Sequence, residues 1–188
     1  VLLALCFNVY SQYPAVKIAE DVDNSFIETG EDSTIHVVYY STGLNKGVYC
    51  YGQTLDGLTN KTEIPGSNRM ARPRVHVDAK GRVHIVFQKG KFGDATSSWY
   101  TRFENDAFIE PEPFAHADSL DVARAFVPDV AADSSGNALV CFWTIGGTGN
   151  HARYRWRSYD GTWSETKGDL SGFHAATPKV EVYDNAFY

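Results

Sequence analysis

The stretch that decides the fold occurs twice: residues 73–87 read PRVHVDAKGRVHIVF, and residues 128–142 read PDVAADSSGNALVCF. In both copies a proline precedes a run of alternating apolar residues. An Asp-x-x-Gly turn and a second alternating run follow. Alternation with a period of two is typical of half-buried strands, and Asp and Gly supply the turn chemistry between them. Each copy therefore predicts a β-hairpin.

The same pattern recurs along the chain with a regular spacing. Residues 27–39 form a weaker copy, with Gly30 in place of the aspartate, and a fourth copy begins at Pro178. The prolines at 73, 128 and 178 are 55 and 50 residues apart. A second hairpin is expected in each unit, around residues 50–56, 100–106 and 154–160. A period near 50 residues with two hairpins per unit indicates the four-stranded blade of a propeller.

The predicted fold class is therefore all-β, a β-propeller of four-stranded antiparallel blades. Blades are expected at about 22–71, 72–126 and 127–176, with the start of another at 177–188. About three and a half blades of a total of six or seven are then present, since propellers close with about four to eight. We expect a fragment of a longer protein, or alternatively a split propeller completed by another chain.

Composition and charge narrow the function classes. Of the 188 residues, 43% are hydrophobic and 21% charged, which excludes a disordered chain. The net charge of −6 gives no reason to expect a nucleic-acid partner.

Residues 1–11 are predicted to be the end of a truncated signal peptide, and residues 12–188 a partial propeller. The alternative for the first segment is a buried strand. A signal peptide would place the protein outside the cytoplasm: secreted, periplasmic or at the cell surface. No run is long enough to span a membrane.

One hairpin turn carries a family resemblance. Residues 158–163 read SYDGTW, which resembles a shortened Asp box, the Ser-x-Asp-x-Gly-x-Thr-Trp hairpin of sialidase-like propellers, also called BNR repeats. Degenerate copies occur at 54–58 and 105–108, and the repeat resemblance covers about residues 22–188. In that family the box is a structural turn on the rim, away from the active site. The resemblance thus implies structural roles for five residues: Ser158, Asp160, Gly161, Thr162 and Trp163.

The resemblance also implies carbohydrate chemistry. Members of this superfamily include sialidases, other glycosidases, polysaccharide lyases and sugar-binding lectins. The Arg-Ile-Pro motif of sialidases is not found here, because Arg72 and Pro73 are adjacent. We expect a propeller that acts on or binds carbohydrate, without a cofactor. If it is an enzyme, a polysaccharide lyase or a glycoside hydrolase is expected. The alternatives are a non-catalytic lectin-like propeller and a protein-interaction scaffold.

The candidate site follows from the positions four residues before the repeat prolines. These positions hold Arg69, Arg124 and His174. In a propeller the loop before the innermost strand opens onto the central channel, so the three side chains should surround one mouth. The planar guanidinium suits a carboxylate or sulfate, and histidine changes charge near neutral pH. We expect substrate binding by Arg69, Arg72 and Arg124 and acid–base catalysis by His174, on uronic, sialic or sulfated sugars. The alternative is that these are solvated loop residues.

Histidines form a second constellation. A symmetric hairpin register places His76 opposite His84, and the same register places Glu28 opposite His36 in the preceding unit. Two cross-strand histidines are half of a metal site, but the neighbouring sequence lacks the Cys and His ligands that would complete it. Histidines hydrogen-bonded between blades are therefore expected, and no metal is expected.

Overall fold

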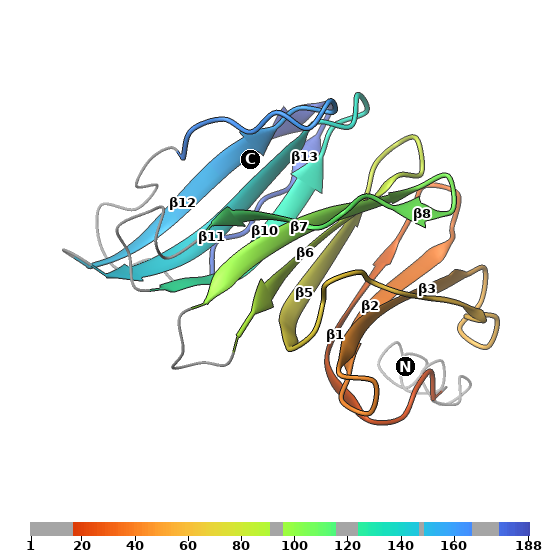
Figure 1. Cartoon of the computed structure of the whole chain (residues 1–188). Helices are drawn as coiled ribbons and strands as arrows, with labels where there is room; N and C mark the ends of the chain where they lie inside the picture. Colours follow the sequence, from red (N-terminus) through yellow and green to blue (C-terminus); the bar gives the residue numbers. More distant parts are fainter. Residues whose placement is uncertain (1–16, 91–95, 116–123, 147–148, 167–176) are drawn as a thin grey trace, which may run out of the picture.

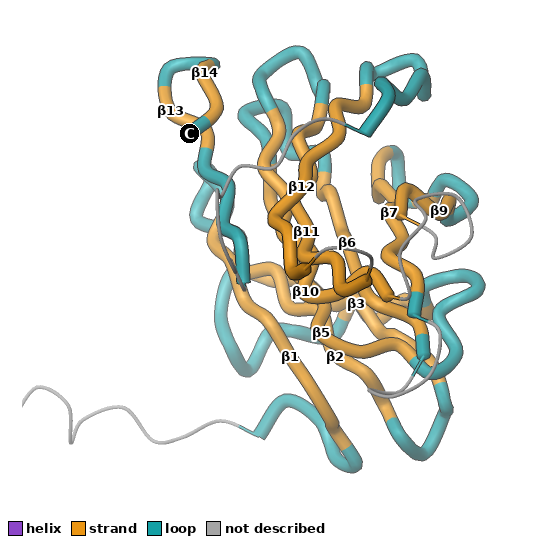
Figure 2. Tube along the Cα trace, turned by 90° about the vertical axis from the view of Figure 1, so that its left-hand side faces the viewer, coloured by secondary structure: helices purple, strands orange, loops and turns teal. Residues whose placement is uncertain are grey.

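The structure, a computed structural model, describes residues 17–90, 96–115, 124–146, 149–166 and 177–188. Within these ranges the chain consists of strands joined by loops and turns, with no helix (Figures 1 and 2). The described ranges accordingly contain no helix long and apolar enough to cross a bilayer. The segment expected to be a signal peptide, residues 1–11, lies outside the described residues.

Most strands form three antiparallel sheets that follow one another along the chain and fan out side by side (Figure 1). The first sheet contains β1 (Val22–Thr29), β2 (Ile35–Ser41), β3 (Lys46–Gly52) and β4 (Asn60–Glu63) in sequential order. The second sheet contains β5 (Met70–Val77), β6 (Val83–Lys89), β7 (Ser97–Glu104), β8 (Ala107–Phe108) and β9 (Glu112–Ala115). Both β8 and β9 pair with β7, so they are one outer strand with an interruption.

The third sheet contains β10 (Arg124–Ala132), β11 (Ala138–Gly146) and β12 (Gly149–Arg157). A bridge between Arg157 and Trp163 adds the beginning of a fourth strand. A short hairpin of β13 (Val182–Tyr183) and β14 (Ala186–Phe187) follows. The expected boundaries at residues 72 and 127 fall inside β5 and β10, which begin at Met70 and Arg124.

The expected hairpin register is confirmed. His76 pairs with His84 between β5 and β6, and Glu28 pairs with His36 between β1 and β2. The alternation of apolar residues fixes this register because a slip by one residue would turn every buried side chain to the other face. The repeats are therefore equivalent in three dimensions, and a position in one sheet can be compared directly with its counterparts.

Every first strand carries a bulge at the same place. The bulges contain Asn24 in β1, Arg72 in β5 and Val127 in β10, all with left-handed backbone angles (φ of 56°, 49° and 45°). Thr177, directly before Pro178, has the same conformation, with φ of 58°. All four residues line one cavity of about 330 Å³. The first strands of successive sheets thus converge on a common axis. We call this the proline end of the sheets. The opposite end, with the turns at 30–34, 78–82 and 133–137, is the turn end.

The core lies between the sheets. Val38, Tyr49, Val75, Ile85 and Phe87 belong to a buried cluster that joins the first sheet to the second. A second cluster joins the second sheet to the third, and a third cluster packs β13 and β14 against the third sheet. Each sheet therefore depends on its neighbours for burial, which is the packing of repeat architectures.

Candidate functional site

Two of the expected binding residues meet at the proline end. Arg69 directly precedes β5 and has a φ of 58°, and Arg72 occupies the bulge of β5. Both line a cavity of about 370 Å³ between the first and second sheets. Asp23 and Asn24 of β1, Tyr40 of β2 and Gln88 of β6 contribute further polar groups to its lining.

Gln88 is the residue of this cavity that sequence reasoning missed. Its side chain is only 2% exposed, and its Oε1 atom has no hydrogen-bond partner in the described part of the chain. A buried acceptor without a donor is costly, at about 1–3 kcal/mol, so a ligand or a water is expected to satisfy it. A polar residue at the end of the apolar run 83–87 was the available signal, but the cavity beside it depends on the neighbouring sheet.

Arg72 also lines the axial cavity, and other charged side chains lie in or beside this cavity. Arg74 shares the lining, and its Nε atom lies 3.9 Å from Oδ1 of Asp129. The Lys179 amine lies 3.9 Å from Oδ2 of the same carboxylate. Burial raises the pKa of Asp129, and the two cations oppose that effect. Arg72, by contrast, makes no ion pair with any described residue.

The structure describes less of the other two expected site residues, Arg124 and His174. Arg124 is the first residue of β10, where its backbone pairs with Ile145. Its position in the third sheet is equivalent to that of Arg69, but its side chain is outside the described set. His174 lies outside the described residues altogether. The structure therefore brings Arg69 and Arg72 to one cavity, and the joint geometry with Arg124 and His174 stays a prediction.

The turn at residues 158–163 is held together by its own side chains. The Asp160 carboxylate accepts hydrogen bonds from the Ser158 hydroxyl and from the Thr162 amide, the latter at 3.0 Å. Gly161 has a φ of 100°, which favours glycine. Trp163 donates from Nε1 to Glu112 at 2.9 Å and stacks on Phe114 with ring centroids 5.5 Å apart. These contacts fasten the third sheet to the second at the turn end, away from the two arginines.

His76 bridges two neighbouring sheets, as expected, whereas the contacts of His84 stay within the second sheet. His76 Nδ1 lies 3.1 Å from Glu28 Oε1 of the first sheet, and its Nε2 lies 3.2 Å from the Ala132 carbonyl of the third. His84 is fully buried and contacts the Tyr100 hydroxyl at 2.8 Å and Asp78 at 3.1 Å. No group of three or more potential metal ligands occurs among the described side chains.

Comparison with known proteins gives the fold. No protein-family model matches this sequence, and no curated protein matches it. Among solved structures, the chain is similar to an endo-arabinase from Bacteroides thetaiotaomicron VPI-5482, with a TM-score of 0.57 and 12% identity over 84% of this chain and 66% of that chain. It is also similar to an ulvan lyase of a new polysaccharide lyase family, with a TM-score of 0.52 and 11% identity over 84% of this chain and 43% of that chain. The fold is that of a β-propeller.

The matched enzymes are longer than the aligned region. The chain spans 66% of the endo-arabinase and 43% of the ulvan lyase. A second structure of the lyase, with a TM-score of 0.53, is bound to a unit of glucuronic acid and sulfated rhamnose. At identities of 11–12% these similarities concern the arrangement of the strands. Fold alone does not determine function, so function has to be argued from the site.

Proposed function

We propose that this propeller binds an acidic glycan at its proline end. The observation that carries the proposal is that Arg69, Arg72 and the unsatisfied Gln88 line the same cavity. Guanidinium groups bind carboxylates and sulfates through paired charge-assisted hydrogen bonds. A sugar hydroxyl supplies the donor that Gln88 Oε1 lacks. A uronic, sialic or sulfated sugar combines an anionic group and hydroxyl donors in one ring.

The remaining polar groups of the cavity fit the same ligand. Asp23 is the one carboxylate in the described lining, and it can accept a hydrogen bond from a sugar hydroxyl. Tyr40 contributes an aromatic ring to the lining, and its hydroxyl donates a hydrogen bond to Asn45 at 2.6 Å. Aromatic rings and a small number of aligned polar groups are typical of small-ligand sites.

Catalysis is a further step of the proposal. We propose His174 as the acid–base residue and Arg124 as an additional anion-binding residue, in the positions equivalent to Arg69. The ulvan lyase with this fold was solved with an acidic, sulfated glycan bound, which is a property of that enzyme and supports acidic glycans as the first compounds to test. Membership of the sialidase-like family, with export from the cytoplasm, is part of the same proposal.

The test is calorimetric titration with polyuronates and sulfated polysaccharides, with uncharged polysaccharides for comparison. We expect binding of the acidic polymers that weakens as salt is raised. Arg72→Ala should weaken it about tenfold or more, since charged hydrogen bonds contribute roughly 1.5–3 kcal/mol. Lys61→Ala, which removes one positive charge from the exposed outer strand β4, is the matched control. Equal losses in both variants, or no binding of any acidic polymer, would contradict the proposal.

The catalytic step has its own readout. A lyase forms unsaturated uronate ends that absorb ultraviolet light, whereas a hydrolase forms new reducing ends. His174→Ala should abolish either product while keeping a large part of the binding. Binding by the unmodified protein without any product would establish a lectin-like propeller instead.

A further inference from the structure

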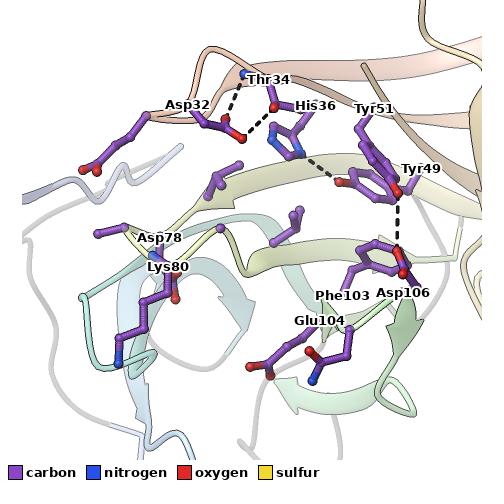
Figure 3. A pocket seen from close by; sticks show the side chains of 16 residues that line it. Asp32, Thr34, His36, Tyr49, Tyr51, Asp78, Lys80, Phe103, Glu104 and Asp106 are labelled. Carbon is purple, nitrogen blue, oxygen red and sulfur yellow. Dashed lines mark hydrogen bonds between the residues drawn. The ribbon is translucent and has the colours of Figure 1, made fainter. Parts of the chain in front are cut away.

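A second and larger cavity lies at the turn end, opposite the arginines. It has a volume of about 660 Å³ and lies between the first and second sheets (Figure 3). The turn at 30–34 and strands β2 and β3 form one wall, while the turn at 78–82 and the end of β7 form the other. The volume is within the range of small-molecule sites, roughly 300–1,000 Å³. We call it the turn-end cavity.

One side of the turn-end cavity is aromatic. Tyr49 and Tyr51 stack with ring centroids 5.5 Å apart, and Phe103 lies 5.0 Å from Tyr49 and 6.1 Å from Tyr51. Tyr51 is half-buried, and its hydroxyl lies 3.4 Å from Asp106 at the rim. Figure 3 shows these rings grouped together on one side of the cavity, with Asp78 and Lys80 on the other. The rings offer a rigid apolar face to a ligand.

His36 contributes a polar atom without a partner. The residue is only 6% exposed, and its Nδ1 atom lies 2.7 Å from the Tyr49 hydroxyl. Its other nitrogen, Nε2, has no hydrogen-bond partner among the described residues. The equivalent His84 of the second sheet also contacts a tyrosine through Nδ1, at 2.8 Å, but its Nε2 contacts the Asp78 carboxylate at 3.1 Å. The first sheet thus keeps the His–Tyr pair and lacks the second partner.

The missing partner results from a single substitution between repeats. Gly30 occupies the place of Asp78, six residues before the histidine in each sheet. A Cβ atom at Gly30 would lie 3.3 Å from His36 Nε2. The same Cβ atom would lie 3.0 Å from Asp32 Oδ1, so the Asp32 carboxylate lies beside this position in the first sheet. That carboxylate accepts from the amide and hydroxyl of Thr34, and it makes no hydrogen bond to the imidazole among the described residues.

The rest of the turn-end cavity is open because the first two sheets also lack an aromatic ring that fills the equivalent space between the second and third sheets. Between the second and third sheets, Tyr159 covers two arginines, with its ring 5.0 Å from Arg82 and 4.4 Å from Arg102. Between the first and second sheets the equivalent positions hold other residues. Asn105 takes the place of Tyr159, Thr34 that of Arg82, and Tyr51 that of Arg102. No stacked triad forms from them, so the equivalent space stays open.

The charge of the lining selects the ligand. Glu31, Asp32, Glu104 and Asp106 line the cavity, whereas Lys80 is the one lysine in the described lining. An anionic ligand would be repelled by these carboxylates. Burial lowers the pKa of His36, so the imidazole is neutral near pH 7. Desolvation raises the pKa of Tyr49, which keeps its hydroxyl protonated. In the tautomer whose Nδ1 accepts from that hydroxyl, Nε2 carries the imidazole proton and needs an acceptor.

We propose that the turn-end cavity binds a neutral sugar residue. A hydroxyl oxygen accepts from His36 Nε2, neighbouring hydroxyls donate to the rim carboxylates, and the apolar face of the ring packs on Tyr51 and Phe103. This site is distinct from the arginine-lined cavity at the proline end, and it does not depend on that proposal. It would give the protein separate contacts for anionic and for uncharged parts of a glycan.

The experiment is a titration followed by amide and imidazole NMR shifts. The probes are methyl glycosides of glucose, galactose, rhamnose and arabinose, with glucuronate and tetramethylammonium as anionic and cationic comparisons. We expect at least one neutral glycoside to shift the signals of His36, Asp32 and Asn105 in a saturable manner. Neither the anion nor the cation should do so. Saturable shifts by the cation alone, or no shift with any neutral glycoside, would overturn the proposal.

Two variants connect the binding to this cavity. Gly30→Asp places a carboxylate beside Nε2, as in the second sheet, and should weaken the neutral sugar about tenfold or more. Thr62→Asp adds the same charge to the exposed strand β4 and should leave the affinity unchanged. If Gly30→Asp does not fold, Gly30→Ala adds a methyl group 3.3 Å from Nε2 and 3.0 Å from Asp32 Oδ1, and it should still weaken binding. Unchanged affinity in a folded Gly30 variant would contradict the assignment.

Discussion

Asp78 holds the turn end of the second sheet together, and replacing it should have a large and pH-dependent effect. Its carboxylate is fully buried. One oxygen, Oδ2, accepts from Arg82 Nε at 2.6 Å and contacts His84 Nε2 at 3.1 Å. The other oxygen accepts from the amides of Lys80 and Arg82. The change Asp78→Asn keeps the size of the side chain and removes its charge.

The expected loss of stability at pH 7 is about 3 kcal/mol. Removing one partner of a buried ion pair costs roughly 3–5 kcal/mol, because the other charge is left uncompensated. The lower end applies here, since Arg82 also donates to the Ser134 carbonyl at 3.1 Å and lies over the Tyr159 ring. The carboxamide introduced by Asp78→Asn would still accept from the turn amides through its carbonyl oxygen, so the local turn should be kept.

The pH dependence has a definite sign. Burial raises the pKa of Asp78, but the hydrogen bonds from His84 and Arg82 outweigh burial and lower this pKa from 3.8 to about 2. A lowered pKa means that the folded state favours the ionised carboxylate. Its contribution is fully present above pH 3.8 and is lost as the pH falls towards 2. The corresponding free energy is about 2 kcal/mol, at about 1.36 kcal/mol per pH unit.

Urea unfolding followed by tryptophan fluorescence, at pH 7, 5 and 2.5, measures both effects. The matched control is Asp133→Asn, in the equivalent turn of the third sheet, where the carboxylate accepts, among the described residues, only from Ser135 and Asn137. The control should lose about 1 kcal/mol, in the range of neutral hydrogen bonds. If Asp78→Asn loses no more than the control, or if it retains the full acid sensitivity of the unmodified protein, the reasoning is wrong.

Three further predictions concern single side chains between the sheets. Tyr159→Ala removes the ring that covers two arginines and should lower the free energy of unfolding by about 1–2 kcal/mol, whereas Tyr183→Ala, at an exposed position, should have little effect in the same urea assay. Trp163→Phe leaves Glu112 without its indole donor and should cost about 1–3 kcal/mol by chemical unfolding. Burial raises the pKa of Cys141 to about 12, so a disulfide reagent at pH 8 should label this thiol only as fast as the protein unfolds; rapid labelling of the folded protein would contradict this.

The fold was predictable because its information is local and repeated. Alternating residues on both sides of an Asp-x-x-Gly turn determine the hairpin and its register, and the pairing of His76 with His84 followed from symmetry alone. The spacing of the prolines then gave the number of residues per sheet. The interruption between β8 and β9 was not anticipated, because it depends on where Pro111 and Pro113 lie relative to the edge of β7.

The candidate sites were less predictable because they form between sheets. Arg69 and Arg72 were expected together since they lie in one short segment, but the cavity beside the buried, unpartnered acceptor of Gln88 depends on β1 and β2 of the first sheet. The replacement of an aspartate by Gly30 was visible in the sequence. Its consequence for His36 was not, because the cavity also requires the absence of a counterpart to Tyr159. Such differences between repeats become informative only when the repeats are superimposed in space.

The four left-handed residues at the axis carry a consequence for how this architecture can change. Glycine would adopt their backbone conformation without steric cost, yet the positions hold Asn24, Arg72, Val127 and Thr177. A left-handed residue with a Cβ atom costs roughly 1–2 kcal/mol, and a branched one such as Val127 is a marked outlier. The side chains at these positions are therefore held at the axis at an energetic cost that the pairing and packing of the sheets must offset. If the axis contributes to the proposed glycan binding, substitutions at these four positions should change the ligand preference without changing the strands that form the blades.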